Sequence, residues 1–152
     1  MKLNYEKLSK KYLNLFENKD RCDFVLTDVL FAFEELYNTI SDSRINSIIE
    51  IGSGTGILLN ELSDAFPKKN FFGLDPHESG FHYYENIKKK LPQKNNLKFK
   101  KAHLKDLPHS DKYDLIFSFN VFEHVENQLN FIKDSYKLLR DDGKKIIFFP
   151  NY

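Results

Sequence analysis

The sequence contains little of several things, and each shortage excludes a class of protein. Cys22 is the single cysteine in 152 residues, so we expect no disulfide framework and a reducing, cytoplasmic compartment. No apolar run approaches the roughly 20 residues that span a membrane, and the N-terminal residues form no apolar signal region. These absences argue against a membrane protein and against a disulfide-rich secreted one.

An excess of charge of one sign is also lacking. The formal net charge is +1, and the only arginines are Arg21, Arg44 and Arg140. Because arginine makes the bidentate contacts to phosphates and bases, its scarcity disfavours a nucleic-acid partner. The lysines within residues 88–105 permit an RNA surface, but lysines also protect exposed strand edges from pairing, and we favour that second interpretation.

What is present predicts one α/β domain with a core of aliphatic and aromatic side chains. From residue 47 onward, short β-branched and aromatic runs alternate with amphipathic helical patterns, which is typical of a parallel sheet with right-handed crossovers. The expected strands are residues 47–52, 70–74, 96–101, 113–119 and 144–149, and the expected helices are residues 55–66, 77–91 and 126–140. Asp141-Asp142-Gly143 is expected to end the last helix in a turn.

Residues 1–46 are expected to form two amphipathic helices ahead of the first strand. Asp20 or Asp23 is a candidate N-cap for the second helix. For that second helix we favour an ordinary cover of one sheet face. For the first helix we favour a lid, because Tyr5, Tyr12 and Phe16 place aromatic rings close to a terminus.

The most specific signal is a glycine-rich segment after the first expected strand. Ile48-Ile49-Glu50-Ile51 reads as a buried strand, and Gly52-Ser53-Gly54-Thr55-Gly56 follows it directly. Three glycines remove Cβ atoms and permit positive φ, so a ligand can lie on the backbone. A dinucleotide fingerprint needs its third glycine at position 57, where this chain has Ile57, which disfavours an NAD-dependent oxidoreductase.

The pattern Glu-x-Gly-x-Gly-x-Gly resembles the first motif of the class I S-adenosylmethionine-dependent methyltransferases. The resemblance implies a Rossmann-like, mostly parallel five-stranded sheet of order 3-2-1-4-5, with helices on both faces. It divides the chain into an N-terminal helical cover or lid, residues 1–46, and an S-adenosylmethionine-binding domain, residues 47–152. It also implies that Glu50, Gly52, Ser53, Gly54 and Gly56 hold the methionine part of the cofactor.

Two later segments complete the cofactor site that the resemblance implies. Asp75 follows the second strand, and an acid placed there accepts hydrogen bonds from ribose hydroxyls. The alternative is that Asp75, with Pro76 after it, caps the next helix. Aligned on Leu107-Pro108, His103 stands where the family usually has an acid that meets the adenine, so we expect His103 and Leu104 at the adenine.

The segment Asn120 to Val125 resembles the loop after the family's fourth strand, beside the transferable methyl group. Asn120 is an expected cofactor contact, and His124 is the candidate general base because its reference pKa suits neutral pH. The alternative, slightly favoured, is that Glu123 and His124 merely begin the next helix. Glu-His here also resembles a metal-dependent subgroup, but two ligands do not make a site of three or four, so we expect no metal.

The last expected strand, residues 144–149, is apolar enough to be buried on both faces. The family sheet has seven strands, so we expect a fragment or a truncated protein. The alternatives are a chain that pairs with itself or a partner through this strand, and a compact variant covered by its own N-terminal helices. The function expected from the resemblance is methyl transfer from S-adenosylmethionine to an unidentified small-molecule acceptor. The alternative is a catalytically incomplete cofactor-binding module that acts through a partner chain.

Overall fold

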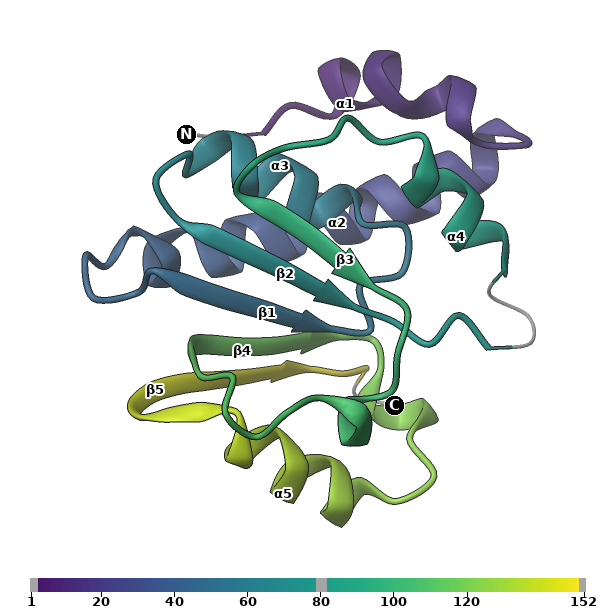
Figure 1. The fold of residues 1–152 in the computed structure, drawn as a ribbon. Helices are drawn as coiled ribbons and strands as arrows, with labels where there is room; N and C mark the ends of the chain where they lie inside the picture. The colour runs from purple at the N-terminus through teal and green to yellow at the C-terminus, as the bar shows by residue number, and fades with distance from the viewer. Residues whose placement is uncertain (1–2, 79–81, 151–152) are drawn as a thin grey trace.

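A computed structural model describes residues 3–78 and 82–150 as helices packed around one parallel sheet (Figure 1). The strands are β1 (Ser47–Ile51), β2 (Asn70–Leu74), β3 (Leu97–Lys100), β4 (Tyr113–Phe119) and β5 (Leu139–Phe148). The helices are α1 (Tyr5–Tyr12), α2 (Lys19–Ser41), α3 (Ile57–Ala65), α4 (His82–Lys89) and α5 (Gln128–Lys137). Three short 3-10 helices join them: η1 (Leu13–Leu15), η2 (Leu104–Asp106) and η3 (Phe122–His124). The sheet order β3-β2-β1-β4-β5, parallel throughout, confirms the predicted fold class.

The two faces of the sheet are covered by different helices. β1 shows the division, because its side chains alternate between the faces. Ile48 belongs to the larger apolar core, which also takes in side chains of α1, α2 and α3. Ile49 and Ile51 belong to a second core, to which Phe131 of α5 contributes. In Figure 1, α5 accordingly lies on the opposite side of the sheet from α1, α2 and α3.

The predicted ends of the last helix and strand were wrong. α5 ends at Lys137, and β5 begins two residues later at Leu139, so Asp141-Asp142-Gly143 lies inside β5. The register between β4 and β5 shifts in this stretch, between Tyr113 and Leu115. A turn was predicted because acids and a glycine read locally as a helix stop, whereas pairing with β4 recruits them into a strand.

The N-terminal helices share the larger core with the sheet. The caps of α1 and α2 are Asn4 and Asn18, whose side chains accept hydrogen bonds from backbone N–H groups, so the prediction of Asp20 or Asp23 as a cap was wrong. Tyr12, at the end of α1, is almost completely buried, and its hydroxyl donates to Glu61 of α3. α1 therefore packs as a cover over α2 and α3.

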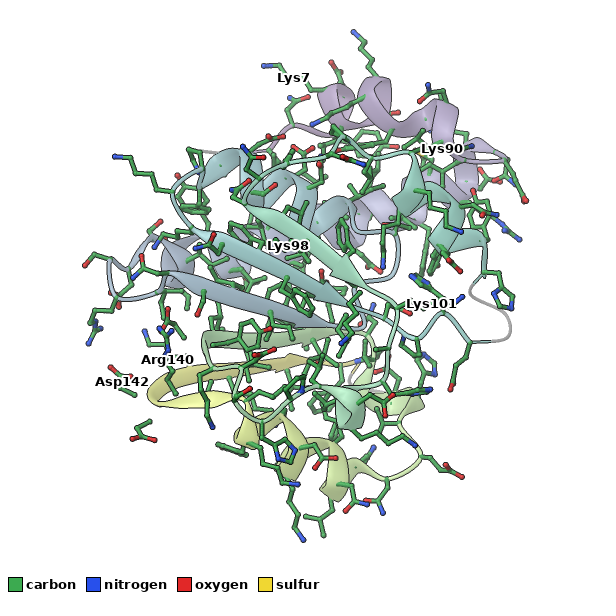
Figure 2. The ribbon with its side chains drawn as sticks, viewed as in Figure 1. Lys7, Lys90, Lys98, Lys101, Arg140 and Asp142 are labelled. Carbon is green, nitrogen blue, oxygen red and sulfur yellow. The ribbon has the colours of Figure 1, made fainter. Side chains whose placement is uncertain are left out.

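The two sheet edges differ in character. β3 forms one edge, and Lys98 and Lys101 are exposed beside it, as the interpretation of a solvated lysine edge expects (Figure 2). β5 forms the other edge, where Ile146, Ile147 and Phe148 are only half-buried. Over the ranges that the structure describes, β5 is therefore an apolar edge strand, and the burial on both faces that its sequence permits is only partial. Among the described residues, no helix has both the length and the apolar character that a membrane crossing needs.

Asp114 joins three elements at the start of β4. It is 6% exposed, and its Oδ2 accepts hydrogen bonds from the backbone N–H groups of Asn46 and Ser47, each at 2.8 Å. Its Oδ1 accepts a hydrogen bond from Arg140 of β5. The carboxylate thereby fixes the entry of the chain into β1, the strand that leads to the glycine segment.

Replacing Asp114 with alanine is expected to lower the free energy of unfolding by about 2 kcal/mol, because two backbone N–H groups lose their acceptor. Burial raises the pKa of Asp114, but the N–H groups of Asn46 and Ser47 and the guanidinium of Arg140 outweigh it and hold the pKa below its usual value. The stabilisation is therefore present above the unfolded pKa of about 3.9 and is lost as pH falls below it. Urea unfolding from pH 7 to pH 3 tests both statements. Exposed Asp111→Ala is the control, and an equal loss in that variant would contradict the assignment.

Candidate functional site

The glycine segment after β1 has the left-handed backbone that its sequence predicts. The φ angles are +80° at Gly52, +47° at Gly54 and +75° at Gly56, which is the N-cap residue of α3. A Cβ atom on Gly52 would lie 2.2 Å from Cγ2 of Val121. The segment therefore brings its backbone directly against the loop after β4, which only a residue without a side chain permits.

A cavity of about 760 Å³ opens above this segment at the carboxyl ends of β1, β2 and β4. Ligands of open α/β sheets bind at this end of the strands. The predicted residues that line it are Glu50, Gly52, Ser53, Gly54, Asp75, Pro76, Asn120 and His124. Gly56, His103 and Leu104 are not among the described lining residues.

Glu50 is the most deeply buried of the described acids that line the cavity. It is 4% exposed, and its Oε2 has no hydrogen-bond partner among the described residues. Burial raises the pKa of Glu50 to about 8, with the Asp75 carboxylate adding to the shift and the Lys88 ammonium opposing it. An unpaired buried carboxyl oxygen is costly in a fold, so it marks a place where a hydrogen-bond donor of a ligand would be stabilised.

Lys88 supports the same segment from the side of α4. Its Nζ lies 2.9 Å from Ser53 Oγ and 2.9 Å from His77 Nε2. Burial lowers the pKa of Lys88 to about 8, although the Asp75 and Glu50 carboxylates act to raise it. Lys88 is thus an exception to the predicted solvated lysine surface, because it holds the glycine segment in place.

Asp75 binds two backbone N–H groups at the end of β2. Oδ2 accepts from Gly54 at 2.7 Å, and Oδ1 accepts from His77 at 2.8 Å. His77 has a φ of +49°, so this turn is held in a conformation that a histidine rarely adopts. α4 is described only from His82, seven residues further on, so Asp75 serves the glycine segment and this turn.

The loop after β4 forms the wall opposite the glycine segment. Asn120 has a φ of +51°, and Glu123 and His124 lie in η3, a separate 3-10 turn that precedes α5. The alternative reading, in which these two residues begin the next helix, was therefore wrong. Asn127 caps α5 instead. Oε2 of Glu123 is a buried atom without a partner among the described residues.

His103 lies outside the cavity but close to its wall. Its Nε2 is 3.3 Å from Oε1 of Glu78, and Glu78 lines the cavity. His103 is also the N-cap residue of η2, where it forms a capping box with Asp106. Its role at the adenine, like that of Leu104, stays a prediction.

One wall of the cavity comes from α2, which sequence reasoning missed as a site element. Phe24, Val25, Asp28 and Val29 line the cavity, and Asn120 Nδ2 donates to Asp28 Oδ2 at 3.2 Å. The spacing of these residues, on adjacent turns, predicts one face of a helix but not what that face meets. No described residue of α1 lines the cavity, so the cavity offers no contact that supports the predicted lid role of α1.

Described residues fit the cofactor expected from the motif. The glycine segment offers an exposed backbone, Glu50 offers an unpaired acceptor, and the volume lies within the usual range for small-molecule sites. By contrast, no group of three or more His, Cys, Asp or Glu side chains suited to a metal ion is found within residues 3–78 and 82–150.

The family model described as "Methyltransferase domain" matches residues 49–144. The chain belongs to the class I S-adenosylmethionine-dependent methyltransferases. The methyltransferase fold is also that of the plantazolicin methyltransferase BpumL in complex with SAH, at a TM-score of 0.63 and 24% identity, over 93% of this chain and 51% of that one. The family and fold predictions are confirmed.

Two curated relatives are also methyltransferases by name. Malonyl-[acyl-carrier protein] O-methyltransferase 2 of Ilyobacter polytropus is 32% identical over 115 residues, 74% of this chain and 42% of that protein. An uncharacterized methyltransferase of Staphylococcus carnosus is 28% identical over 122 residues, 79% of this chain and 55% of that protein. The chain thus spans about half the length of the curated relatives it matches.

Proposed function

We propose that this methyltransferase domain transfers a methyl group from S-adenosylmethionine to a small-molecule or carrier-bound acceptor. The observation that carries the proposal is the buried, unpaired Oε2 of Glu50 beneath a glycine segment with left-handed backbone. When bound, the cofactor supplies an electrophilic methyl group on a sulfonium sulfur. The chain then has to bind the two reactants and orient them toward each other. This positioning lowers the barrier, because the reaction then takes place within one complex.

The described residues divide this work among three strand ends. Glu50 and the glycine segment would hold the methionine portion, and Asp75 the ribose hydroxyls, since each of its oxygens retains a lone pair beyond the backbone bonds. His103 and Leu104 would lie towards the adenine. His124, which is exposed on the cavity wall, would accept a proton from the acceptor.

A second candidate function rests on β5. Within the described part of the chain this strand pairs with β4 alone, and Phe149 after it is 57% exposed. An open apolar edge favours pairing with another chain, so the domain would bind the cofactor but act through a partner. Size-exclusion chromatography with light scattering, alongside a turnover assay, separates the two. An active monomer supports catalysis by this chain, and an inactive dimer supports the module.

Asp75→Asn is expected to weaken binding of S-adenosylhomocysteine by about 1.5–3 kcal/mol, because the ribose hydroxyls lose a charged acceptor. Isothermal titration calorimetry on the whole chain measures this. Asp111→Asn, at an exposed site away from the cavity, is the matched control. Unchanged affinity in Asp75→Asn would reject the ribose role, and no binding by the folded native chain at millimolar ligand would reject the proposed function.

A further inference from the structure

The cavity is acidic in a chain that is nearly neutral overall. Six carboxyl groups line it, and no lysine or arginine is found among its described lining residues. The six are Asp28, Glu50, Asp75, Glu78, Glu123 and Glu126. Lys88 reaches Ser53 from α4 without lining the cavity, and the carboxylates that act on its pKa are Asp75, Glu50 and Glu85, not Asp28.

Glu50 is mostly protonated at pH 7 in the ligand-free chain, because burial raises its pKa to about 8. The bound cofactor would be the partner of only some of the six carboxyl groups. Its sulfonium and ammonium groups are positive and its carboxylate is negative, so it brings one net positive charge. Glu50 and Asp75 lie where that ligand is proposed to bind. Asp28 on α2 and Glu123 on η3 lie on the walls contributed by α2 and by the loop after β4, and Oε2 of Glu123 is buried without a partner among the described residues.

Aromatic rings accompany Asp28. Tyr84 lies over the glycine segment, since a Cβ atom on Gly54 would be 3.6 Å from Cδ2 of Tyr84. Tyr84 and Asp28 both line the cavity, and burial raises the pKa of Tyr84, with the Asp28 carboxylate adding to the shift. Phe24, one turn before Asp28 on α2, lines the same wall. A carboxylate flanked by aromatic rings is a surface that binds organic cations.

We propose that the acceptor is an amine, which binds in its ammonium form between the Asp28 carboxylate and the rings of Phe24 and Tyr84. This inference rests on the proposed function and names its substrate class. The hydrogen bond from Asn120 Nδ2 orients the Asp28 carboxylate. A malonyl group, by contrast, ends in a carboxylate, and this wall would repel that anion.

The transfer itself balances without another reactant. The ammonium releases one proton, which passes through His124 to water, and the nitrogen lone pair then forms the new N–C bond while the S–C bond breaks. The electron pair of the S–C bond stays on sulfur. The products are a methylated ammonium ion, a neutral thioether and the released proton.

The test compares three probes that share a phenyl ring and differ in charge: phenethylamine, phenethyl alcohol and hydrocinnamate. Calorimetry with the whole chain saturated with S-adenosylhomocysteine measures their affinities. The amine is expected to bind roughly tenfold more tightly than the alcohol, and hydrocinnamate more weakly than either. Asp28→Asn, which keeps the shape and an acceptor for Asn120, is expected to remove the amine preference and leave binding of S-adenosylhomocysteine and phenethyl alcohol unchanged.

Glu35→Gln is the matched control, because Glu35 is an exposed acid of the same helix outside the cavity. An amine preference that survives in Asp28→Asn, or is lost equally in Glu35→Gln, would overturn the inference. Binding of none of the three probes to the loaded protein would overturn it as well. Failure of S-adenosylhomocysteine to bind would instead reject the proposed function.

Discussion

Glu50→Gln is expected to make the ligand-free protein more stable at pH 8 and, at the same time, a weaker binder of S-adenosylhomocysteine. In the folded chain, burial raises the pKa of Glu50 to about 8, whereas the pKa of a glutamate in the unfolded chain is about 4.3. Between these values the folded state holds a proton that the unfolded state has released. Stability of the native chain therefore falls as pH rises from about 4.3 towards 8.

Glutamine carries no charge at any pH, so the variant lacks this loss. At pH 8 the free energy of unfolding of Glu50→Gln is expected to exceed that of the native chain by about 2–4 kcal/mol, and the difference is expected to vanish near pH 4. Urea unfolding at both pH values measures it. Exposed Glu34→Gln on α2 is the control, and parallel pH dependence in the native chain and Glu50→Gln would contradict a raised pKa.

Binding should change in the opposite direction. The ammonium group of the ligand favours the ionised carboxyl, so the native chain is expected to release protons when S-adenosylhomocysteine binds at pH 6.5, and Glu50→Gln is expected to release fewer. Calorimetry in two buffers of different ionisation enthalpy measures the protons released. A variant that gains stability but loses affinity identifies a residue that is retained for ligand binding. Replacing a structural residue would instead lower both stability and affinity.

Local sequence was sufficient for most of the strands. Residues 70–74 and 113–119 were predicted with the bounds of β2 and β4, because each is an apolar run bordered by polar or turn-forming residues. Local sequence was insufficient to predict the start of β5. Leu139 and Arg140 continue a helical pattern, and only pairing with β4 makes them part of a strand. A helix end is set by such tertiary competition as well as by its own residues.

The same distinction holds for the site. Glu50, Gly52 and Asp75 follow strands of a parallel sheet, so their positions along the chain already imply that they meet at one edge. Asp28 and Lys88 lie on helices, and their position depends on which helix face packs towards the cavity. Helical periodicity defines a face but not its neighbour, so neither residue could be assigned to the site from sequence alone.

Gly52→Ala is expected to have the largest effect on stability of the three glycine-to-alanine changes in the glycine segment. A new Cβ atom would lie 2.2 Å from Cγ2 of Val121, and the φ of +80° disfavours any residue with a side chain. Left-handed backbone costs about 1–2 kcal/mol and overpacking about 1–3 kcal/mol, so a loss of about 2–5 kcal/mol is expected. Measurable binding of S-adenosylhomocysteine is expected to disappear with it.

Gly54→Ala separates the two contributions to this loss. Its φ is +47°, but the nearest atom to the new Cβ is Cδ2 of Tyr84 at an ordinary 3.6 Å, so only the backbone cost of about 1–2 kcal/mol applies. The double variant Gly52→Ala with Val121→Ala removes the clash and should recover part of the stability. Urea unfolding of the three variants measures how much of the loss comes from the backbone conformation and how much from the clash with Val121. Equal losses in Gly52→Ala and Gly54→Ala would show that close approach to Val121 is not what requires glycine at position 52.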